Sequence, residues 1–380
     1  MEFETEYLQI LKKLENIEVK NYQKTRNYLD GEVSFLSPYI THGVLPLKFV
    51  ADFVIRKFGL KGPGNAEHFI FQLGWHEYFQ KIWLDIGDKV LSPVKNPQKS
   101  VESLLIGKNL LEAKTGINVI DDSILNLYKN GYMHNHARMW TASIICNLHK
   151  TGFKAPADWL FYHLLDGDIA SNYLSWQWVA GTFSSKKYLC NQENLNKYSK
   201  CKQFNTPIDK SYEEIAEMVD DPNYCLDLGQ RVELELPVYI PDLPKPNLDL
   251  TGLKVSLFSI WTLDPNFAVD DESQKILLIE PGFLTKFKMS EKRINFILNL
   301  AKNIPGIEIL VMDYDQFDLE FALKCTQVSA KFHPACSHWT NVDFTEADYI
   351  FPDINPPFRS YFDFWNKAKK YLEKEYAKTK

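Results

Sequence analysis

A change in hydrophobic periodicity near residue 250 divides the sequence into two structural classes. Before it, apolar residues recur at helical spacing in one segment after another, with few strand-like alternations between them. After it, short β-rich runs alternate with an amphipathic helical segment, which is typical of a parallel α/β layer. The sequence therefore predicts an α plus α/β fold, with an all-helical part first and a small Rossmann-like α/β part second.

The predicted elements give three regions along the chain. Helices are predicted at 7–14, 44–58, 66–86, 119–128, 133–148 and 159–165, and these define a helical domain over 1–203. Six prolines and one helical segment (212–218) indicate a connector over 204–250. Strands at 254–261, 275–280 and 307–312, with helices at 290–303 and 359–376, define an α/β domain over 251–380.

Composition limits the classes of function. The chain has 380 residues, of which 45% are hydrophobic, so it can bury a core without disulfides or metals. Residues 1–200 carry 23 Lys and Arg against 20 Asp and Glu, whereas the remainder carries 20 against 29. The first part can therefore accept a phosphate backbone on one face, and the second part repels one.

Targeting signals and cysteine spacing indicate where the protein works. The acidic start has no apolar signal core and no stretch of eighteen apolar residues occurs, so we expect a cytoplasmic protein without a membrane partner. None of the six cysteines forms a CxxC motif, which favours free thiols. A metal or iron–sulfur centre would have to be assembled from scattered positions, and we predict none.

Residues 34–43 form the first cluster that could carry chemistry. Ser34, Ser37, Thr41 and nearby backbone N–H groups precede a predicted helix, where the helix dipole favours a phosphate. Ordinary N-capping explains the same hydroxyl groups. The spacing alone leaves both interpretations open.

The second and third clusters complement one another. Arg138 lies on one helix face with His134 at i,i+4 and is adjacent to Asn135 at i,i+3, next to apolar positions. Such polar groups need a ligand or one another, and Asp166 is a candidate partner for Arg138. His134 and His136 point apart, which argues against a metal. An alternative for Asp166 and the segment after it, up to 178, is a capping aspartate followed by core tryptophans.

Taken together, these stretches resemble the FAD-binding half of photolyases and cryptochromes over residues 25–185. The matching motifs are LSPY at 36–39 with Gly43, WHEYF at 75–79, TGINVID at 115–121, GYMHN at 131–135, Arg138 with Met139, DGD at 166–168, Asn172, and WQW at 176–178. Their order and gaps agree with the family. The resemblance implies a helical domain that holds a folded FAD.

The resemblance assigns residues to the cofactor. It implies that Ser34, Leu36 and Ser37 line the phosphate and ribityl part, with His76 at the flavin phosphates. It implies that Asn135, Arg138, Asp166 and Asp168 contact the flavin region and that Asn172 faces flavin N5. The protein would orient and tune the cofactor, and the flavin would supply the redox chemistry.

The resemblance also implies a reaction, light-driven DNA repair by a deoxyribodipyrimidine photo-lyase, which is a carbon–carbon lyase. A pyrimidine dimer would flip out of damaged DNA, stack on Trp75 and contact Met139 and Gln72, and the reduced flavin would pass it an electron. Trp176 matches the first tryptophan of the family's electron-transfer chain.

Several departures keep a second function open. Gln72 stands where repairing members often have Glu, and His76 replaces an Arg. The middle tryptophan position falls on Phe153, although Trp140 and Trp159 offer another route. The alternatives are a cryptochrome-like blue-light receptor with a protein signalling partner, or a flavoprotein that has lost its light chemistry.

The order of the domains is the last departure. The family starts with an α/β domain that can hold an antenna chromophore, whereas here the β-rich part follows the helices. The runs 255–266 and 356–365 resemble the opening and closing segments of that domain. We therefore expect a circular permutation, with an unrelated α/β domain as the alternative, and no residue demands an antenna pigment.

Overall fold

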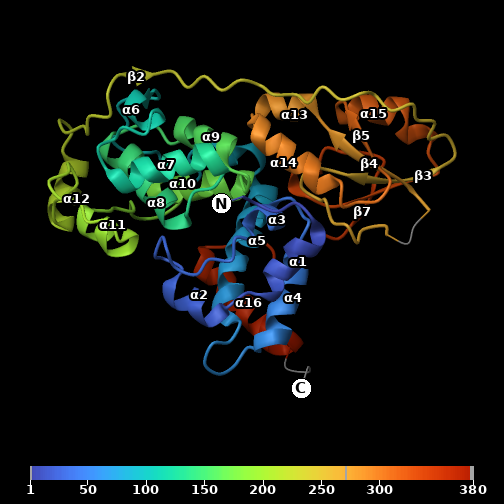
Figure 1. Cartoon of the computed structure of the whole chain (residues 1–380), viewed down its shortest axis with the longest axis horizontal. Helices are drawn as coiled ribbons and strands as arrows, with labels where there is room; N and C mark the ends of the chain where they lie inside the picture. The colour runs from blue at the N-terminus through green and yellow to red at the C-terminus, as the bar shows by residue number, and fades with distance from the viewer. Residues whose placement is uncertain (1, 270–271, 377–380) are drawn as a thin grey trace. The chain divides into compact units, whose positions relative to one another are not determined.

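The protein is described here by a computed structural model that covers residues 2–269 and 272–376 (Figure 1). The chain forms two compact units, and each combines segments that are distant in the sequence. Unit 1 contains residues 1–3, 20–33 and 86–237, and unit 2 contains 4–19, 34–85 and 238–380. The predicted domain boundaries at residues 203 and 250 stay a prediction.

Unit 1 is almost entirely helical. Its helices are α2 (Val19–Thr25), α6 (Lys108–Leu111), α7 (Asn118–Asn130), α8 (Asn135–Ser143), α9 (Lys154–His163), α10 (Ile169–Ala180), α11 (Gln192–Ser199) and α12 (Tyr212–Asp220), with the short helical turns η1 (Gly87–Leu91) and η2 (Ile144–Leu148). Helix α10 packs against α8 and α9. A two-stranded antiparallel pair, β1 (Ile106–Gly107) and β2 (Arg231–Val232), joins the segment before α6 to the segment after α12.

Local sequence signals explain where these helices begin and end. Gly131 adopts a left-handed conformation (φ 66°) and ends α7, as expected for a glycine just after a helix. Ser211 and Glu214 form a reciprocal capping box at the start of α12. Asp168 caps α10 by accepting a hydrogen bond from the Ser171 N–H at 2.6 Å.

Unit 2 contains a five-stranded parallel sheet. Its strands are β3 (Lys254–Phe258), β4 (Gln274–Ile279), β5 (Ile307–Val311), β6 (Gln327–Lys331) and β7 (Asp343–Thr345), in the order β5-β4-β3-β6-β7. Figure 1 shows α13 (Pro281–Lys286), α14 (Glu291–Ala301) and α15 (Tyr314–Glu320) beside this sheet. The order runs outward in both directions from β3, which is the doubly wound arrangement of Rossmann-like folds.

The sheet is buried on both faces, as parallel sheets are. Val255 and Leu257 of β3 belong to a core that also contains Tyr314 and Phe317 of α15. Phe258 points to the opposite face and is also buried, as are Ile294, Ile297 and Leu300 of α14. The alternating side chains of β3 therefore fill two cores.

The remaining helices of unit 2 come from both ends of the chain. They are α1 (Tyr7–Glu15), α3 (Ser37–Thr41), α4 (Leu47–Phe58), α5 (Glu67–Ile86) and α16 (Tyr361–Glu375). The α1 helix is tied to the α/β layer because Asn303 Oδ1 accepts from the Tyr7 N–H at 2.9 Å. The α3 segment is tied to β3 because His42 Nδ1 lies 2.6 Å from the Ile260 carbonyl.

Most predicted elements are confirmed, with corrections at their ends. The predicted helix at 44–58 begins only at Leu47, because Pro46 has extended backbone angles. The predicted helix at 159–165 begins earlier, at Lys154, and ends at His163. The predicted α plus α/β class is confirmed as helices plus a parallel sheet.

Candidate functional site

The predicted site residues divide between the two units. Unit 1 contains Asn135, Arg138, Met139, Asp166, Asp168, Asn172 and Trp176, and unit 2 contains Ser34, Leu36, Ser37, Gln72, Trp75 and His76.

In unit 1, Arg138 and Asp166 form the ion pair that the sequence predicts. Arg138 Nη2 lies 2.9 Å from both carboxylate oxygens of Asp166, and the Arg138 Nε–H donates to the Met133 carbonyl at 2.8 Å. The side chain of Asp166 is only 4% exposed, so its charge depends on this partner. The pair fixes the start of α8 against the loop before α10.

The loop from Asp166 leads directly into α10. Asp168 caps this helix, which confirms the capping interpretation for that residue. One turn on, the amide nitrogen of buried Asn172 donates to the Ala157 carbonyl of α9 at 2.9 Å. This bond uses one of the two amide hydrogens of Asn172, so the other hydrogen and the amide oxygen are left for other contacts.

Three polar residues open α8. His134 is its N-cap, with Nδ1 accepting from the His136 N–H at 3.1 Å. Burial, with the neighbouring charges of His136 and Arg138, lowers the pKa of His134 to about 4, so it is neutral at pH 7. Exposed Asn135 makes a weak 3.9 Å contact with the Met139 sulfur.

The histidines of this helix do not gather as metal ligands. The His136 ring stacks on Trp140 at 4.7 Å, and its Nδ1 lies 2.8 Å from the Asn27 carbonyl. Within residues 2–269 and 272–376, no group of three His, Cys, Asp or Glu side chains could hold a metal ion. All six cysteines are free thiols. The described chain also contains no helix with the length and hydropathy needed to cross a bilayer.

The tryptophans of the predicted electron-transfer chain are all buried, but they do not stack on one another. Trp176 is buried, yet no aromatic ring of the described residues contacts its indole, and Phe153 makes no ring contact either. Trp140 donates from Nε1 to Asn194, and Trp159 donates from Nε1 to the Tyr128 hydroxyl at 3.0 Å. The alternative electron-transfer route through Trp140 and Trp159 stays a prediction, and neither ring contacts the Trp176 indole.

In unit 2, the 34–43 segment forms a tight turn and a short helix. Ser34 Oγ accepts weakly from the Leu36 N–H at 3.4 Å, and the Leu36 side chain is fully buried. Gly43 has φ 69°, and a Cβ there would lie 2.5 Å from the Trp261 carbonyl oxygen. Only glycine therefore allows this segment to approach the chain after β3.

Trp75, the predicted base-stacking residue, already has an aromatic partner. The Tyr361 ring of α16 stacks on Trp75 with centroids 3.6 Å apart and planes 13° apart. The Tyr361 hydroxyl donates to the Phe71 carbonyl, and a Cβ at Gly74 would lie 2.8 Å from that hydroxyl. Within unit 2, Tyr361 therefore covers one face of Trp75.

His76 and Gln72 lie on the same helix. The Gln80 amide lies 3.1 Å from Nε2 of both His76 and His333, so His76 is linked to the segment after β6. Gln72 is half-buried on the same helix. Sequence reasoning missed Tyr361 and Gln80, because neither contact follows from spacing along the chain.

The crevice at the end of β3 is filled by side chains. In doubly wound sheets, ligands bind where the strand order reverses, which here lies between β3 and β6. The rings of Trp261 and His333 stack there at 5.3 Å and 6°, and His42 stacks on Trp261 at 5.7 Å. The two cavities beside these rings are small, about 20 Å³ and about 50 Å³, and have room only for water molecules.

Comparisons with known proteins match part of the chain. Residues 69–215 match the family model described as the FAD binding domain of DNA photolyase. A deoxyribodipyrimidine photo-lyase of Streptomyces griseus is 30% identical over 167 residues, covering 43% of this chain and 35% of that protein. A cryptochrome DASH of Danio rerio is 28% identical over 171 residues, covering 43% and 32%.

The similarity covers only part of this chain and part of each relative. The chain spans about a third of the length of these curated relatives. A Synechocystis cryptochrome structure is 22% identical, with a TM-score of 0.46 and coverage of 52% of this chain and 44% of that one. The matched segment contains α7 to α10, including the Arg138–Asp166 pair and Asn172. Residues 69–215 are therefore similar to the FAD-binding domain of DNA photolyases, and part of the chain is similar to curated photolyases and cryptochromes.

Proposed function

We propose that this protein binds FAD and repairs pyrimidine dimers in damaged DNA by light-driven photolyase chemistry. The observation that supports it most directly is the Arg138–Asp166 pair, which joins two separate family motifs within 2.9 Å in a largely buried place. Such a pair would hold its shape beside a bound cofactor. The matched segment gives the chemical class.

The residues of unit 1 suit a flavin. Arg138 keeps a positive charge, Asp168 fixes the first turn of α10, and Asn172 presents an amide oxygen. A flavin ring edge carries both donors and acceptors, and these side chains supply the complementary groups. When bound, FAD would supply light-driven one-electron chemistry, and the protein would position it and exclude water.

The DNA-facing assignments depend on the family resemblance. Trp75 would stack on the flipped dimer, with Met139 and Gln72 in contact with it, and Ser34, Leu36, Ser37 and His76 would serve the phosphate side. Trp75 has one face against Tyr361, so a base would stack on its other face. The slight excess of Lys and Arg in residues 1–200 is compatible with a DNA backbone.

A cryptochrome-like photoreceptor with a protein signalling partner is the second candidate. Two observations favour it: Gln72 is neutral where repairing relatives often carry Glu, and the Trp176 indole lacks a ring contact among the described residues. Both functions use the same FAD-binding residues. The antenna chromophore, the cytoplasmic location and the permuted order of the α/β part stay predictions.

A repair assay separates the two candidates. Purified protein with bound, reduced FAD is illuminated with dimer-containing single- and double-stranded DNA, and the remaining dimer is counted. Repair predicts dimer loss only in the light, and DNA binding that weakens as salt rises. Bound FAD with no loss of dimer in the light would exclude the photolyase and leave the photoreceptor.

A further inference from the structure

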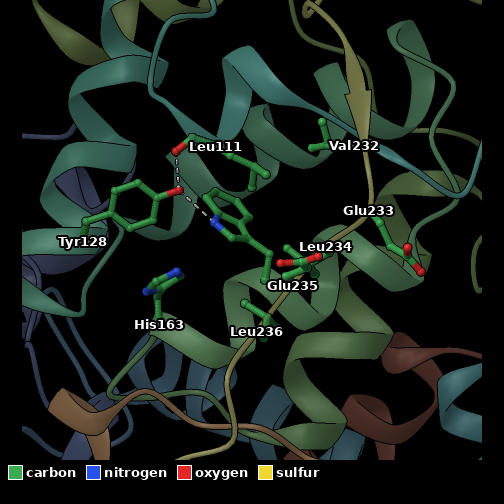
Figure 2. Close-up of a pocket in the computed structure, with 9 residues that line it drawn as sticks. Leu111, Tyr128, His163, Val232, Glu233, Leu234, Glu235 and Leu236 are labelled. Carbon is green, nitrogen blue, oxygen red and sulfur yellow. Dashed lines mark hydrogen bonds between the residues drawn. The ribbon is translucent and has the colours of Figure 1, made fainter.

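A pocket of about 450 Å³ lies in unit 1, apart from the predicted flavin-binding residues (Figure 2). It is lined by Leu111 of α6, Tyr128 of α7, Trp159 and His163 of α9, and residues 232–236, which follow β2. The volume falls in the range of small-molecule sites. None of these residues is a predicted FAD or DNA contact, and only buried Trp159 has another predicted role, in the alternative electron-transfer route.

Aromatic side chains form one wall of the pocket. The Tyr128 hydroxyl donates to the Leu111 carbonyl at 2.8 Å and accepts from Trp159 Nε1 at 3.0 Å, as the dashed lines in Figure 2 show. The Tyr128 and His163 ring centroids are 4.7 Å apart. Trp159 is buried behind Tyr128, whose hydroxyl is already hydrogen-bonded, so this wall offers a ligand the half-buried rings of Tyr128 and His163.

In the opposite wall of the pocket, exposed and half-buried side chains alternate along residues 233–236. Leu234 and Leu236 are half-buried, whereas Glu233 and Glu235 between them are exposed. Neither glutamate forms an ion pair or hydrogen bond with the part of the chain that the structure describes. The lining therefore has two uncompensated carboxylates and no Lys or Arg.

Together, the carboxylates and the aromatic rings favour a positively charged ligand. Carboxylates attract a cation and repel phosphates, and aromatic rings attract a cation through their negative faces. A sugar would find few hydrogen-bonding partners on the aromatic wall, and a nucleotide would be repelled by the glutamates. A positively charged ligand with an apolar body satisfies both walls.

We propose that this pocket binds an organic cation, a substituted ammonium on a compact apolar or aromatic body. The body contacts the half-buried rings of Tyr128 and His163, and the charge is compensated by the exposed carboxylates of Glu233 and Glu235. The proposal does not depend on FAD or DNA binding.

The test compares three probes of similar size by calorimetry on the full chain: benzyltrimethylammonium, neutral benzyl alcohol and anionic benzoate. We expect one saturable site at which the cation binds at least ~10-fold more tightly than the neutral probe. Binding of the cation should weaken as salt rises. Equal affinity for cation and neutral probe, or no binding of the cation, overturns the proposal.

A variant that lacks the two glutamate charges tests whether the cation binds in this pocket. The double substitution Glu233→Gln and Glu235→Gln changes two exposed side chains and should weaken cation binding about fivefold or more. Glu213→Gln, an exposed glutamate of α12, is the matched control and should leave binding unchanged. If the double variant binds the cation as tightly as the control does, the charge site lies elsewhere and the proposal fails.

Discussion

Arg138 and Asp166 show how a single contact can organise a site. The Asp166 carboxylate is nearly removed from water and accepts from Arg138 Nη2, while the Arg138 Nε–H donates to the Met133 carbonyl. Desolvating a carboxylate is costly, and the arginine offsets that cost only while it stays in place. The pair therefore contributes mainly to the position of α8 and of the loop before α10.

Removing one charge of this pair should affect both folding and cofactor retention. Asp166→Asn leaves the guanidinium without its anion, and we expect a loss of about 2–4 kcal/mol in the free energy of unfolding. We also expect much lower FAD content after desalting. Chemical denaturation and flavin absorbance measure the two effects. Asp122→Asn, which neutralises an exposed aspartate of α7, should change neither.

Asn172 tests the predicted position of flavin N5. Asn172→Ala removes both the donor to the Ala157 carbonyl and the amide oxygen, so we expect a stability loss of about 1 kcal/mol. FAD retention should weaken, or the reduced flavin should become less stable, as a reductive titration would show. Ser175→Ala on the exposed face of α10 is the control. Unchanged occupancy and redox behaviour in Asn172→Ala would contradict the placement.

The Arg138–Asp166 contact could be predicted from sequence, because two charged residues beside apolar stripes need a partner. The sequence also offered a helix-capping aspartate in this segment, because Asp is favoured just before the first turn of a helix. The stacking of Tyr361 on Trp75 was not, since 286 positions separate the two residues and no periodicity links them. The sequence therefore allowed interactions that follow from the local chemistry of a motif to be predicted, but not contacts between residues far apart in the chain.

At the level of elements, helix α5 holds the turn that precedes α16. Glu77 accepts from the Ile350 N–H at 2.7 Å and the Phe351 N–H at 3.1 Å, and it lies 3.2 Å from Lys81 Nζ. The Lys81 ammonium also donates to the Phe351 and Ile354 carbonyls. Burial raises the pKa of Glu77 to about 7 and lowers that of Lys81. Sequence reasoning did not find this buried pair.

This pair predicts a pH dependence of stability. The pKa of Glu77 is raised above its unfolded value, so the folded state holds the proton more tightly and loses stability as pH rises from about 4.5 to 7. Glu77→Gln does not titrate. The unfolding free energy of the natural protein, relative to this variant, should fall by up to about 3 kcal/mol across that range. A constant difference between pH 5 and 8 would contradict the assignment.

Elements with strong periodicity were predicted, and weakly patterned ones were missed. Helix α14 has Ser290 as the predicted cap, because a hydroxyl before an amphipathic run is a clear signal. Strands β6 and β7 were not predicted, since β6 mixes polar and apolar residues and β7 has three residues. Their pairing with β3 and with one another makes them strands.

For the whole molecule, the main finding is that unit 2 is built from both ends of the chain. Residues 34–85 share it with residues after 238, through contacts such as Glu77 with Ile350 and His42 with Ile260. No sequence pattern predicted this grouping, because it depends on contacts between segments about 200 or more residues apart.

Limited proteolysis tests this arrangement. The described chain from 233 to 249 contains no helix or strand, and Val238 and Ile240 are exposed there, so thermolysin should cut in this stretch first. The two fragments should still elute together under native conditions, because unit 2 holds segments of both. Fragments that separate without denaturant would contradict the composition of unit 2.

The absorption spectrum of the purified protein tests the central claim, that residues 69–215 bind FAD through the Arg138–Asp166 region. The account predicts a yellow protein with the blue absorption bands of a flavin and one FAD per chain, or uptake to that level when FAD is added. A folded protein that stays colourless and takes up no added FAD would contradict it.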